Sequence, residues 1–127
     1  MRLDVVRSIY ESFAVGDFST SLRHFDPSFV LVIDEPLPDA GAHVGRQGLR
    51  AYMDGFLEPW EKLTITATSL EQAGDTVLAE CTQAGTGIES GAATELRYYQ
   101  LWTFRGDALI HLEVTNDRER ARSAAGL

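Results

Sequence analysis

The sequence has little cysteine, little histidine and a shortage of basic side chains. Its one cysteine, Cys81, cannot form a disulfide within the chain, and its strand-like surroundings favour a small core residue over a nucleophile. The three histidines lack the spacing of metal-binding motifs, so we expect no metal site. Lys and Arg total 11 against 19 Asp and Glu, a formal net charge of −8. This balance argues against nucleic acids and anionic membranes as partners, because both attract basic surfaces.

The chain also lacks long apolar runs and a glycine-rich phosphate loop. No run approaches the roughly 18 residues of a membrane span. Asp4, Arg7 and Glu11 interrupt the region where a signal peptide needs an apolar core, so we expect a cytoplasmic protein. The glycines between residues 85 and 91 separate two predicted strands and do not open a helix, and no cofactor is expected.

What is present fits one domain over residues 1–127. Hydrophobic residues make up 44% of the sequence, which suits one core at this length. Apolar residues at three- and four-residue steps predict helices at residues 3–15, 18–25 and 45–60. The run of β-formers at residues 29–34 predicts a buried strand, and a proline-rich loop follows it.

The second half of the chain predicts a series of strands. Alternating residues predict strands at 62–72 and 76–84, joined by a turn at Ala73-Gly74-Asp75. The stretch from Glu95 to Asp117 predicts two more strands, joined at residues 105–107. Residues 118–127 fit either a short helix or a frayed end. Helices early and strands late predict an α+β fold with an antiparallel meander.

Four segments carry a family resemblance that covers nearly the whole chain. They are FAVGDFSTSLRHFDPSFVLVIDEP, HVGRQGLRAYM, TFRGDALIHLEV and the ending AAGL. In this order they resemble the SnoaL-like polyketide-cyclase group of the nuclear-transport-factor-2-like (NTF2-like) superfamily, which also holds ketosteroid isomerase. The resemblance implies a cone, also called cystatin-like, in which a curved, mostly antiparallel sheet wraps around three N-terminal helices and encloses a pocket. It also implies a homodimer.

Asp34 is the first candidate for catalysis. It ends the apolar run 29–34 and precedes the proline-rich loop, so its carboxylate is expected at the rim of an apolar cavity. Burial there would raise its pKa and suit it to proton transfer. The resemblance supports this role, because the general-base aspartate of ketosteroid isomerase ends a strand in a similar place. Glu35 is an equally placed rival, and the alternative is that one or both carboxylates cap the loop in solvent.

Gln100 is the second candidate. The isomerase builds its oxyanion hole from a tyrosine on the first helix and a protonated aspartate on a late strand. The resemblance places Ile9 at the tyrosine position, with Tyr10 beside it, and Gln100 at the aspartate position. A glutamine amide can still donate a hydrogen bond to a developing oxyanion, alone or with Tyr10 or Tyr52.

Aromatic residues are expected to wall the pocket. Strand alternation puts Tyr98, Gln100, Trp102 and Phe104 on one face, which is either the concave wall or a dimer interface. On the helices the same role is predicted for an apolar face that includes Phe56, unless that face is plain core. The full set of expected substrate-binding residues is Tyr10, Phe13, Glu35, Tyr52, Phe56, Trp60, Tyr98, Trp102 and Glu113.

Three further positions stay open at this level. His111 and Glu113 share one face of the last strand, which either points inward as part of a proton relay or lies outside, with outside favoured for His111. His43 is either a lid residue or an exposed loop histidine. Arg97 falls on the face opposite Gln100, which argues against an Asp-Arg-Asp hydrolase arrangement.

These observations lead to two functional hypotheses. The first is a small SnoaL-like enzyme of isomerase or cyclase type that uses cofactor-free acid–base chemistry on a hydrophobic cyclic carbonyl compound. The alternative is a non-catalytic module for binding a small ligand or for dimerisation. The first needs an apolar pocket that accepts a small hydrophobic molecule and into which a carboxylate opens. The second predicts either an aromatic pocket that holds a ligand or a filled core, without a poised acid.

Overall fold

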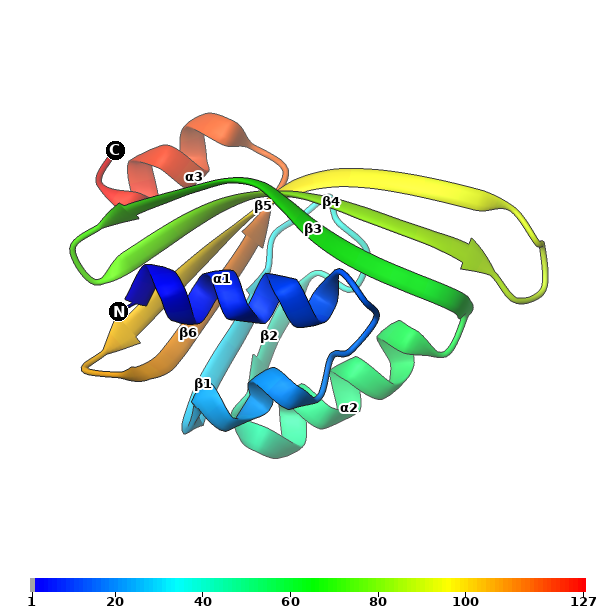
Figure 1. The fold of residues 1–127 in the computed structure, drawn as a ribbon, viewed down its shortest axis with the longest axis horizontal. Helices are drawn as coiled ribbons and strands as arrows, with labels where there is room; N and C mark the ends of the chain where they lie inside the picture. The colour runs from blue at the N-terminus through cyan, green and yellow to red at the C-terminus, as the bar shows by residue number, and fades with distance from the viewer. Residues whose placement is uncertain (1) are drawn as a thin grey trace.

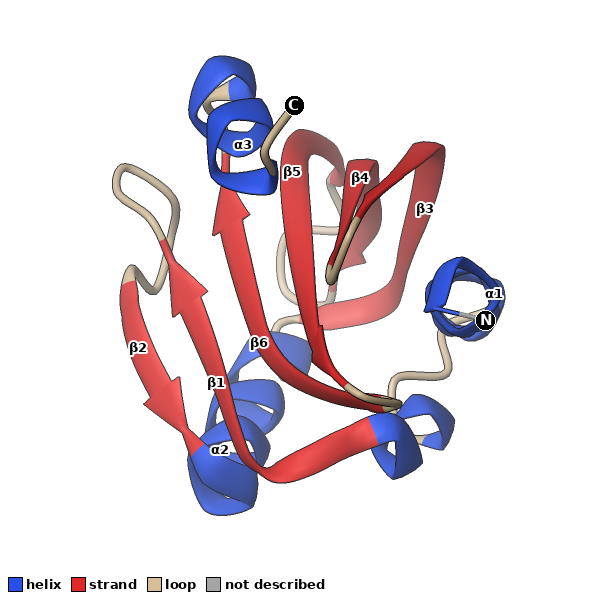
Figure 2. Cartoon of the chain, turned by 90° about the vertical axis from the view of Figure 1, so that its left-hand side faces the viewer, coloured by secondary structure: helices blue, strands red, loops and turns tan. Residues whose placement is uncertain are grey.

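Six strands form one strongly curved sheet that gives the molecule its cone shape (Figures 1 and 2). The structure is a computed structural model that describes residues 2–127. The strands are β1 (Phe25–Ile33), β2 (Gly41–Val44), β3 (Trp60–Ala73), β4 (Thr76–Gly87), β5 (Ala93–Arg105) and β6 (Ala108–Thr115). Their order across the sheet is β2-β1-β6-β5-β4-β3. Only the β1–β6 pair is parallel, so the predicted mostly antiparallel α+β cone is confirmed.

Helices cover the two faces of the sheet unequally. The concave side holds α1 (Arg2–Phe13), the 3₁₀ helix η1 (Thr20–His24) and α2 (Gly45–Leu57). The main core lies between these helices and the inner side of the sheet, and it includes Val6 and Ile9 of α1. On the outer side, α3 (Arg118–Ala125) packs in a small separate cluster against β4 and β5. The sequence left this last segment open, and the structure makes it a helix capped by Asp117. Within residues 2–127, no helix has the length and apolar character needed to cross a bilayer.

Several predicted boundaries in the first half of the chain are wrong. The helix expected at 18–25 is the shorter 3₁₀ helix η1, and Phe25 already belongs to β1. The strand expected at 29–34 begins at Phe25, because β1 contains an irregularity between Phe25 and Val30 that lets it include a proline. The predicted loop after it contains the short edge strand β2. Its first residues, Gly41 and Ala42, have weak strand propensity, so pairing with β1 rather than local sequence makes it a strand.

The region around Trp60 also differs from its prediction. Pro59 lacks an amide hydrogen and ends α2 early, so Trp60 is the first residue of β3 instead of the last of a helix. Two of the three glycines expected in a loose connection, Gly85 and Gly87, belong to β4, and Gly91 lies in the connection that follows it. A Cβ atom at Gly85 would lie 2.7 Å from Cε3 of Trp60, so this glycine is required by close packing of the indole ring.

Candidate functional site

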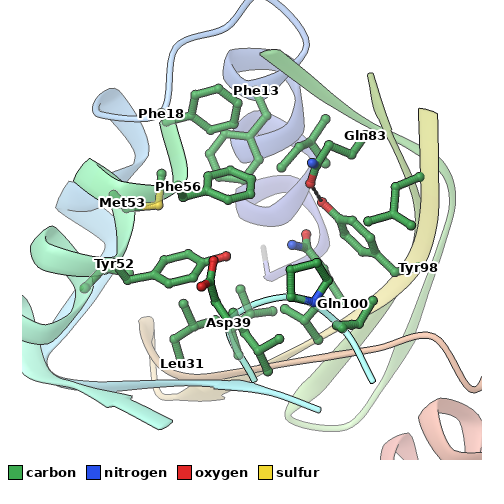
Figure 3. A pocket seen from close by; sticks show the side chains of 18 of the residues that line it. Phe13, Phe18, Leu31, Asp39, Tyr52, Met53, Phe56, Gln83, Tyr98 and Gln100 are labelled. Carbon is green, nitrogen blue, oxygen red and sulfur yellow. Dashed lines mark hydrogen bonds between the residues drawn. The ribbon is translucent and has the colours of Figure 1, made fainter. Parts of the chain in front are cut away.

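A largely apolar cavity of about 490 Å³ opens between the concave side of the sheet and the helices α1, η1 and α2. The structure places seven of the predicted site residues on its wall: Phe13, Tyr52, Phe56, Trp60, Tyr98, Gln100 and Trp102. The face of β5 that carries Gln100 is therefore concave, as predicted, and does not face a dimer partner. Figure 3 shows aromatic rings surrounding the cavity, with a few polar groups directed into it.

Gln100 is oriented by a chain of buried hydrogen bonds. Trp102 Nε1 donates to Tyr10 Oη at 2.8 Å, and Tyr10 Oη donates to Gln100 Oε1 at 2.6 Å. An indole N–H can only donate, so the tyrosine oxygen must accept from Trp102 and its own proton must go to Gln100. The Gln100 oxygen is thereby committed to Tyr10. The amide NH₂ of Gln100 has no protein partner among the described residues and is directed into the cavity (Figure 3).

Tyr10 belongs to this chain and not to the cavity wall. Its ring is 5% exposed, and burial raises the pKa of its hydroxyl well above the ordinary value. The hydroxyl therefore stays protonated and keeps donating to Gln100. The sequence predicted Tyr10 as a residue that touches substrate, and the structure instead makes it a support for Gln100. Its side chain leaves α1 on the side that faces β5, behind the amide.

Cys81 completes the buried polar cluster. Its thiol lies 3.4 Å from Tyr10 Oη and 3.6 Å from Gln100 Oε1. Burial raises the pKa of this thiol to about 12, so it is not a thiolate at neutral pH. The prediction that Cys81 is a core residue is confirmed, since its side chain is fully buried.

A second amide, Gln83 of β4, faces the same cavity. Tyr98 Oη donates to Gln83 Oε1 at 2.8 Å, which leaves the Gln83 NH₂ without a protein partner in the described chain. The sequence analysis missed this residue. A signal was present, because Gln83 lies two positions from Cys81 and strand alternation puts both on one face.

Asp39 is the carboxylate at the cavity mouth that the sequence did not reveal. It lies in the loop between β1 and β2 and is directed toward Tyr52 of α2 (Figure 3). Its backbone has a φ of 62°, in the left-handed region that few non-glycine residues adopt. Burial, and secondarily the charge of Asp39, raises the pKa of Tyr52 to about 12. No periodicity marks a residue in such a loop, so only the folded chain places Asp39.

Asp34 and Glu35 do not line the cavity. Strand alternation explains this, because Phe29, Leu31 and Ile33 of β1 are buried on the inner face and the next residue is directed to the outer face. Glu35 is exposed in the loop. The expected positions of these two carboxylates are therefore corrected, although the strand they follow was predicted.

Asp34 instead joins Glu113 and Arg120 outside the cone. Arg120 Nε donates to Asp34 Oδ2 and to Glu113 Oε2, each at 2.9 Å. Burial raises the pKa of Asp34, but hydrogen bonds from Glu113 and Arg120 outweigh it and hold this pKa below the ordinary value. The hydrogen bond to Asp34, followed by burial, raises the pKa of Glu113. Through Arg120, this carboxyl pair connects β6 and the end of β1 to α3, and neither carboxylate is on the cavity wall.

The remaining predicted positions fall as follows. His111 lies on the outer face opposite Thr103, as favoured, while Leu112 and Val114 line the cavity. Arg97 is exposed, in agreement with its predicted face. His43 is neither a lid nor an exposed loop residue. It lies in β2 with its ring 4.7 Å from that of Tyr52.

The chemistry available in the cavity follows from these groups. Two amide donors face an apolar interior, and the carboxylates on the wall, Asp39 and Glu95, are exposed. Such a site suits a ring system with one or two hydrogen-bond acceptors. In residues 2–127, no cluster of His, Cys, Asp and Glu has the arrangement of a metal site.

Comparisons with known proteins agree with this architecture. An NTF2-like protein from Burkholderia thailandensis is 21% identical, with a TM-score of 0.79 over 99% of this chain and 97% of its own. A putative SnoaL-like polyketide cyclase from Jannaschia sp. CCS1 is 15% identical, with a TM-score of 0.77 over 98% and 90%. A protein with a ketosteroid isomerase-like fold from Catenulispora acidiphila, solved with trimethylamine, is 15% identical, with a TM-score of 0.77 over 100% and 95%.

At these identities the solved structures establish the fold alone. No protein with a curated description matches the sequence significantly. The family model of the SnoaL-like domain matches residues 6–112, from the middle of α1 to the middle of β6. This match spans most of the chain and includes both amides of the cavity. The chain therefore belongs to the SnoaL-like domain family.

Proposed function

We propose that this protein binds a small, largely apolar cyclic compound inside the cone and that the compound presents a carbonyl oxygen to Gln100. The observation that carries the proposal is the hydrogen-bond chain from Trp102 through Tyr10. It commits the Gln100 oxygen to the protein and turns the NH₂ toward the cavity. The NH₂ of Gln100 is thus a hydrogen-bond donor without an acceptor in the protein, and a carbonyl oxygen of the ligand would accept from it.

The size and lining of the cavity support the same ligand class. A volume of about 490 Å³ lies within the usual range for small-molecule sites and is large enough for a compound of two or three fused rings. Aromatic walls favour ring systems, because they bury flat apolar surface and offer edge and face contacts. Each 100 Å² of apolar ligand surface removed from water contributes about 2.5 kcal/mol before the costs of association.

A matched pair of probes tests the proposal. We expect 1-tetralone to bind about tenfold more tightly than tetralin, which has the same two rings without the oxygen. Isothermal titration calorimetry and the fluorescence of the cavity-lining Trp60 and Trp102 measure both affinities. Gln100→Leu should lower the affinity for 1-tetralone to that for tetralin and leave the affinity for tetralin unchanged. The exposed Gln72→Leu is the control and should change neither.

Two outcomes would overturn it. One is a wild-type protein that binds neither probe, and the other is a Gln100→Leu variant that keeps the full preference for the ketone. Because the leucine leaves the Tyr10 hydroxyl without its acceptor, thermal unfolding of each variant accompanies the titrations. Gln100→Glu serves as a second variant that keeps an acceptor for Tyr10. Titrations at several pH values separate its ionised form, which cannot donate to the ketone, from its protonated form, which can.

A second candidate is turnover of the cyclase or isomerase type through an enolate. Membership of the SnoaL-like family and the direction of the Gln100 donor favour it, because the same NH₂ would stabilise an oxyanion more strongly than a ketone. Deuterium exchange at the carbon beside the carbonyl of 1-tetralone, followed by NMR in D₂O, measures this step. Acceleration that Gln100→Leu abolishes would support turnover. Asp39→Asn and Glu95→Gln test which carboxylate acts as the base. If the protein exchanges deuterium no faster than buffer does, turnover is contradicted and only the binding function remains.

We also propose a homodimer that forms through the outer face of the sheet. The outer side of β1 and β2 carries Val30 and Val44, which pair with each other, and Val44 is 64% exposed. Val30 is half-buried, so the pair presents one exposed and one partly exposed aliphatic side chain, which suits a self-complementary contact. Size-exclusion chromatography with light scattering should give twice the monomer mass, and Val44→Asp should shift the protein toward monomer. A wild-type monomer at high concentration would contradict this proposal.

A further inference from the structure

The wall of the cavity carries negative charge and no balancing positive charge. Among the described residues, its ionisable acids are Asp39 and Glu95, and it contains no lysine, arginine or histidine. Glu95 has Arg97 at 3.7 Å as an ion-pair partner. Asp39 has neither an ion pair nor a hydrogen bond from any side chain or amide in residues 2–127. The mouth therefore holds one unneutralised carboxylate next to an apolar interior.

The arginines near this region face another space. Arg46 and Arg50 of α2 line an adjoining hollow of about 720 Å³, together with Arg23 of η1, and this hollow shares Leu49 and Met53 with the cavity wall. Tyr52 and Phe56 of α2 line the main cavity and not the adjoining hollow, whereas the three arginines line only the hollow. The cavity wall therefore offers the carboxylates of Asp39 and Glu95 but no cationic side chain.

Asp39 is also placed beside an aromatic surface. Figure 3 shows the carboxylate directed toward Tyr52, whose ring stacks on that of Phe56 with 5.5 Å between the centroids. A carboxylate next to an aromatic face attracts an ammonium group in two ways, by charge and by the quadrupole of the ring. It repels a carboxylate or phosphate, for which the wall offers no cationic side chain.

We infer that the ligand carries a protonated amine, which lies at the mouth beside Asp39 while its ring body fills the apolar interior. The inference rests on the proposed binding function and adds a charge to the ligand class. A compound with both groups would place its carbonyl oxygen on Gln100 and its ammonium on Asp39, since both side chains line the same cavity. An anionic analogue of the same shape would be rejected.

Three probes with one ring system separate these cases. They are 2-aminotetralin, which is a cation at neutral pH, the neutral 2-tetralol, and the anion tetralin-2-carboxylate. By calorimetry at low salt we expect the amine to bind about three- to tenfold more tightly than the alcohol, and the carboxylate to bind more weakly than both. Salt at about 1 M, where the Debye length is about 3 Å, should remove most of the amine preference and leave the alcohol unchanged.

Variants assign the effect to one residue. Asp39→Asn should bring the amine to the affinity of the alcohol, while Asp107→Asn, the same change at an exposed turn between β5 and β6, should keep the preference. If the alcohol binds but the amine binds no better, or if Asp39→Asn keeps the preference, the inference is wrong and the proposed function stands. If neither 1-tetralone nor 2-tetralol binds, the proposed function itself fails.

Discussion

Replacing Tyr10 with phenylalanine should destabilise the protein far more than the loss of one hydroxyl suggests. The hydroxyl accepts from Trp102 Nε1 at 2.8 Å and donates to Gln100 Oε1 at 2.6 Å. Trp102 is fully buried although its residue borders the cavity, so the loss of the hydrogen-bond partner of its N–H should cost about 1–3 kcal/mol. The Gln100 oxygen borders the cavity and can be rehydrated, which adds about 1 kcal/mol.

The expected loss is therefore about 2–4 kcal/mol, a substantial share of the stability of a small domain. For a chain of 127 residues this corresponds to a fall in Tm of about 10 °C. Chemical denaturation and thermal unfolding measure it. Tyr98→Phe is the matched control, because it also removes one hydroxyl, but that hydroxyl and its partner Gln83 both border the cavity. We expect this control to cost about 1 kcal/mol or less.

A double-mutant cycle identifies the cause. If the unpaired indole N–H is the main penalty, then Trp102→Phe should cost at least about 1 kcal/mol less in the Tyr10→Phe background than in the wild type. The same variant should also lose the preference for 1-tetralone over tetralin, because Gln100 is no longer held with its NH₂ inward. A Tyr10→Phe protein within about 0.5 kcal/mol of the wild type, or less affected than Tyr98→Phe, would refute the hydrogen-bond chain.

Three other predictions concern pH, thiol reactivity and packing. The pKa of Glu113 is raised in the folded state, so its contribution favours folding at acid pH and is lost as pH rises through that pKa. Thermal unfolding from acid to neutral pH should show this contribution as a stability difference between the wild type and Glu113→Gln that shrinks as pH rises; parallel pH profiles would contradict it. The Cys81 thiol, with a pKa of about 12, should react with Ellman's reagent only after unfolding, and rapid labelling of the native protein at pH 8 would exclude the buried position. Gly85→Ala should cost about 1–3 kcal/mol in urea denaturation, because its Cβ would lie 2.7 Å from an indole carbon. Gly55→Ala in α2 is the control, because the added Cβ meets no atom within 4 Å, and it should stabilise the protein by about 0.5–1 kcal/mol. If Gly85→Ala destabilises the protein by less than Gly55→Ala stabilises it, the close packing of Trp60 on Gly85 is contradicted.

Much of the fold was predictable from local patterns. The three- and four-residue steps of α1 and α2 and the alternation of β3 to β6 give each element its type. The resemblance to the SnoaL-like group supplied the cone, since its segments occur in order along the chain. The misplaced boundaries lie where tertiary contacts override local preference. Trp60 shows this, because it enters β3 by pairing with Gly87 after Pro59 has ended the helix.

The residues of the candidate site were predictable only where alternating side chains distinguish the two faces of a strand. Tyr98, Gln100 and Trp102 alternate with residues of the other face on β5, and all three reach the cavity. Asp34 follows a strand that is apolar on both faces, so its sequence contains no indication of which side is inward. Choosing the inner side requires knowing what packs against each face.

Gln100 marks the division between the two kinds of information. The sequence by itself determined that a glutamine stands on the aromatic face of a strand, because the pleat sends alternate residues to the same side. Only the tertiary structure decided that its NH₂ points inward, because Tyr10 on α1 and Trp102 on β5 meet across 92 positions of sequence. The same holds for Asp39, whose loop has no period and is placed by the elements around it. Hydrogen-bond direction and charge placement depend on contacts between distant segments, and those contacts exist only in the folded chain.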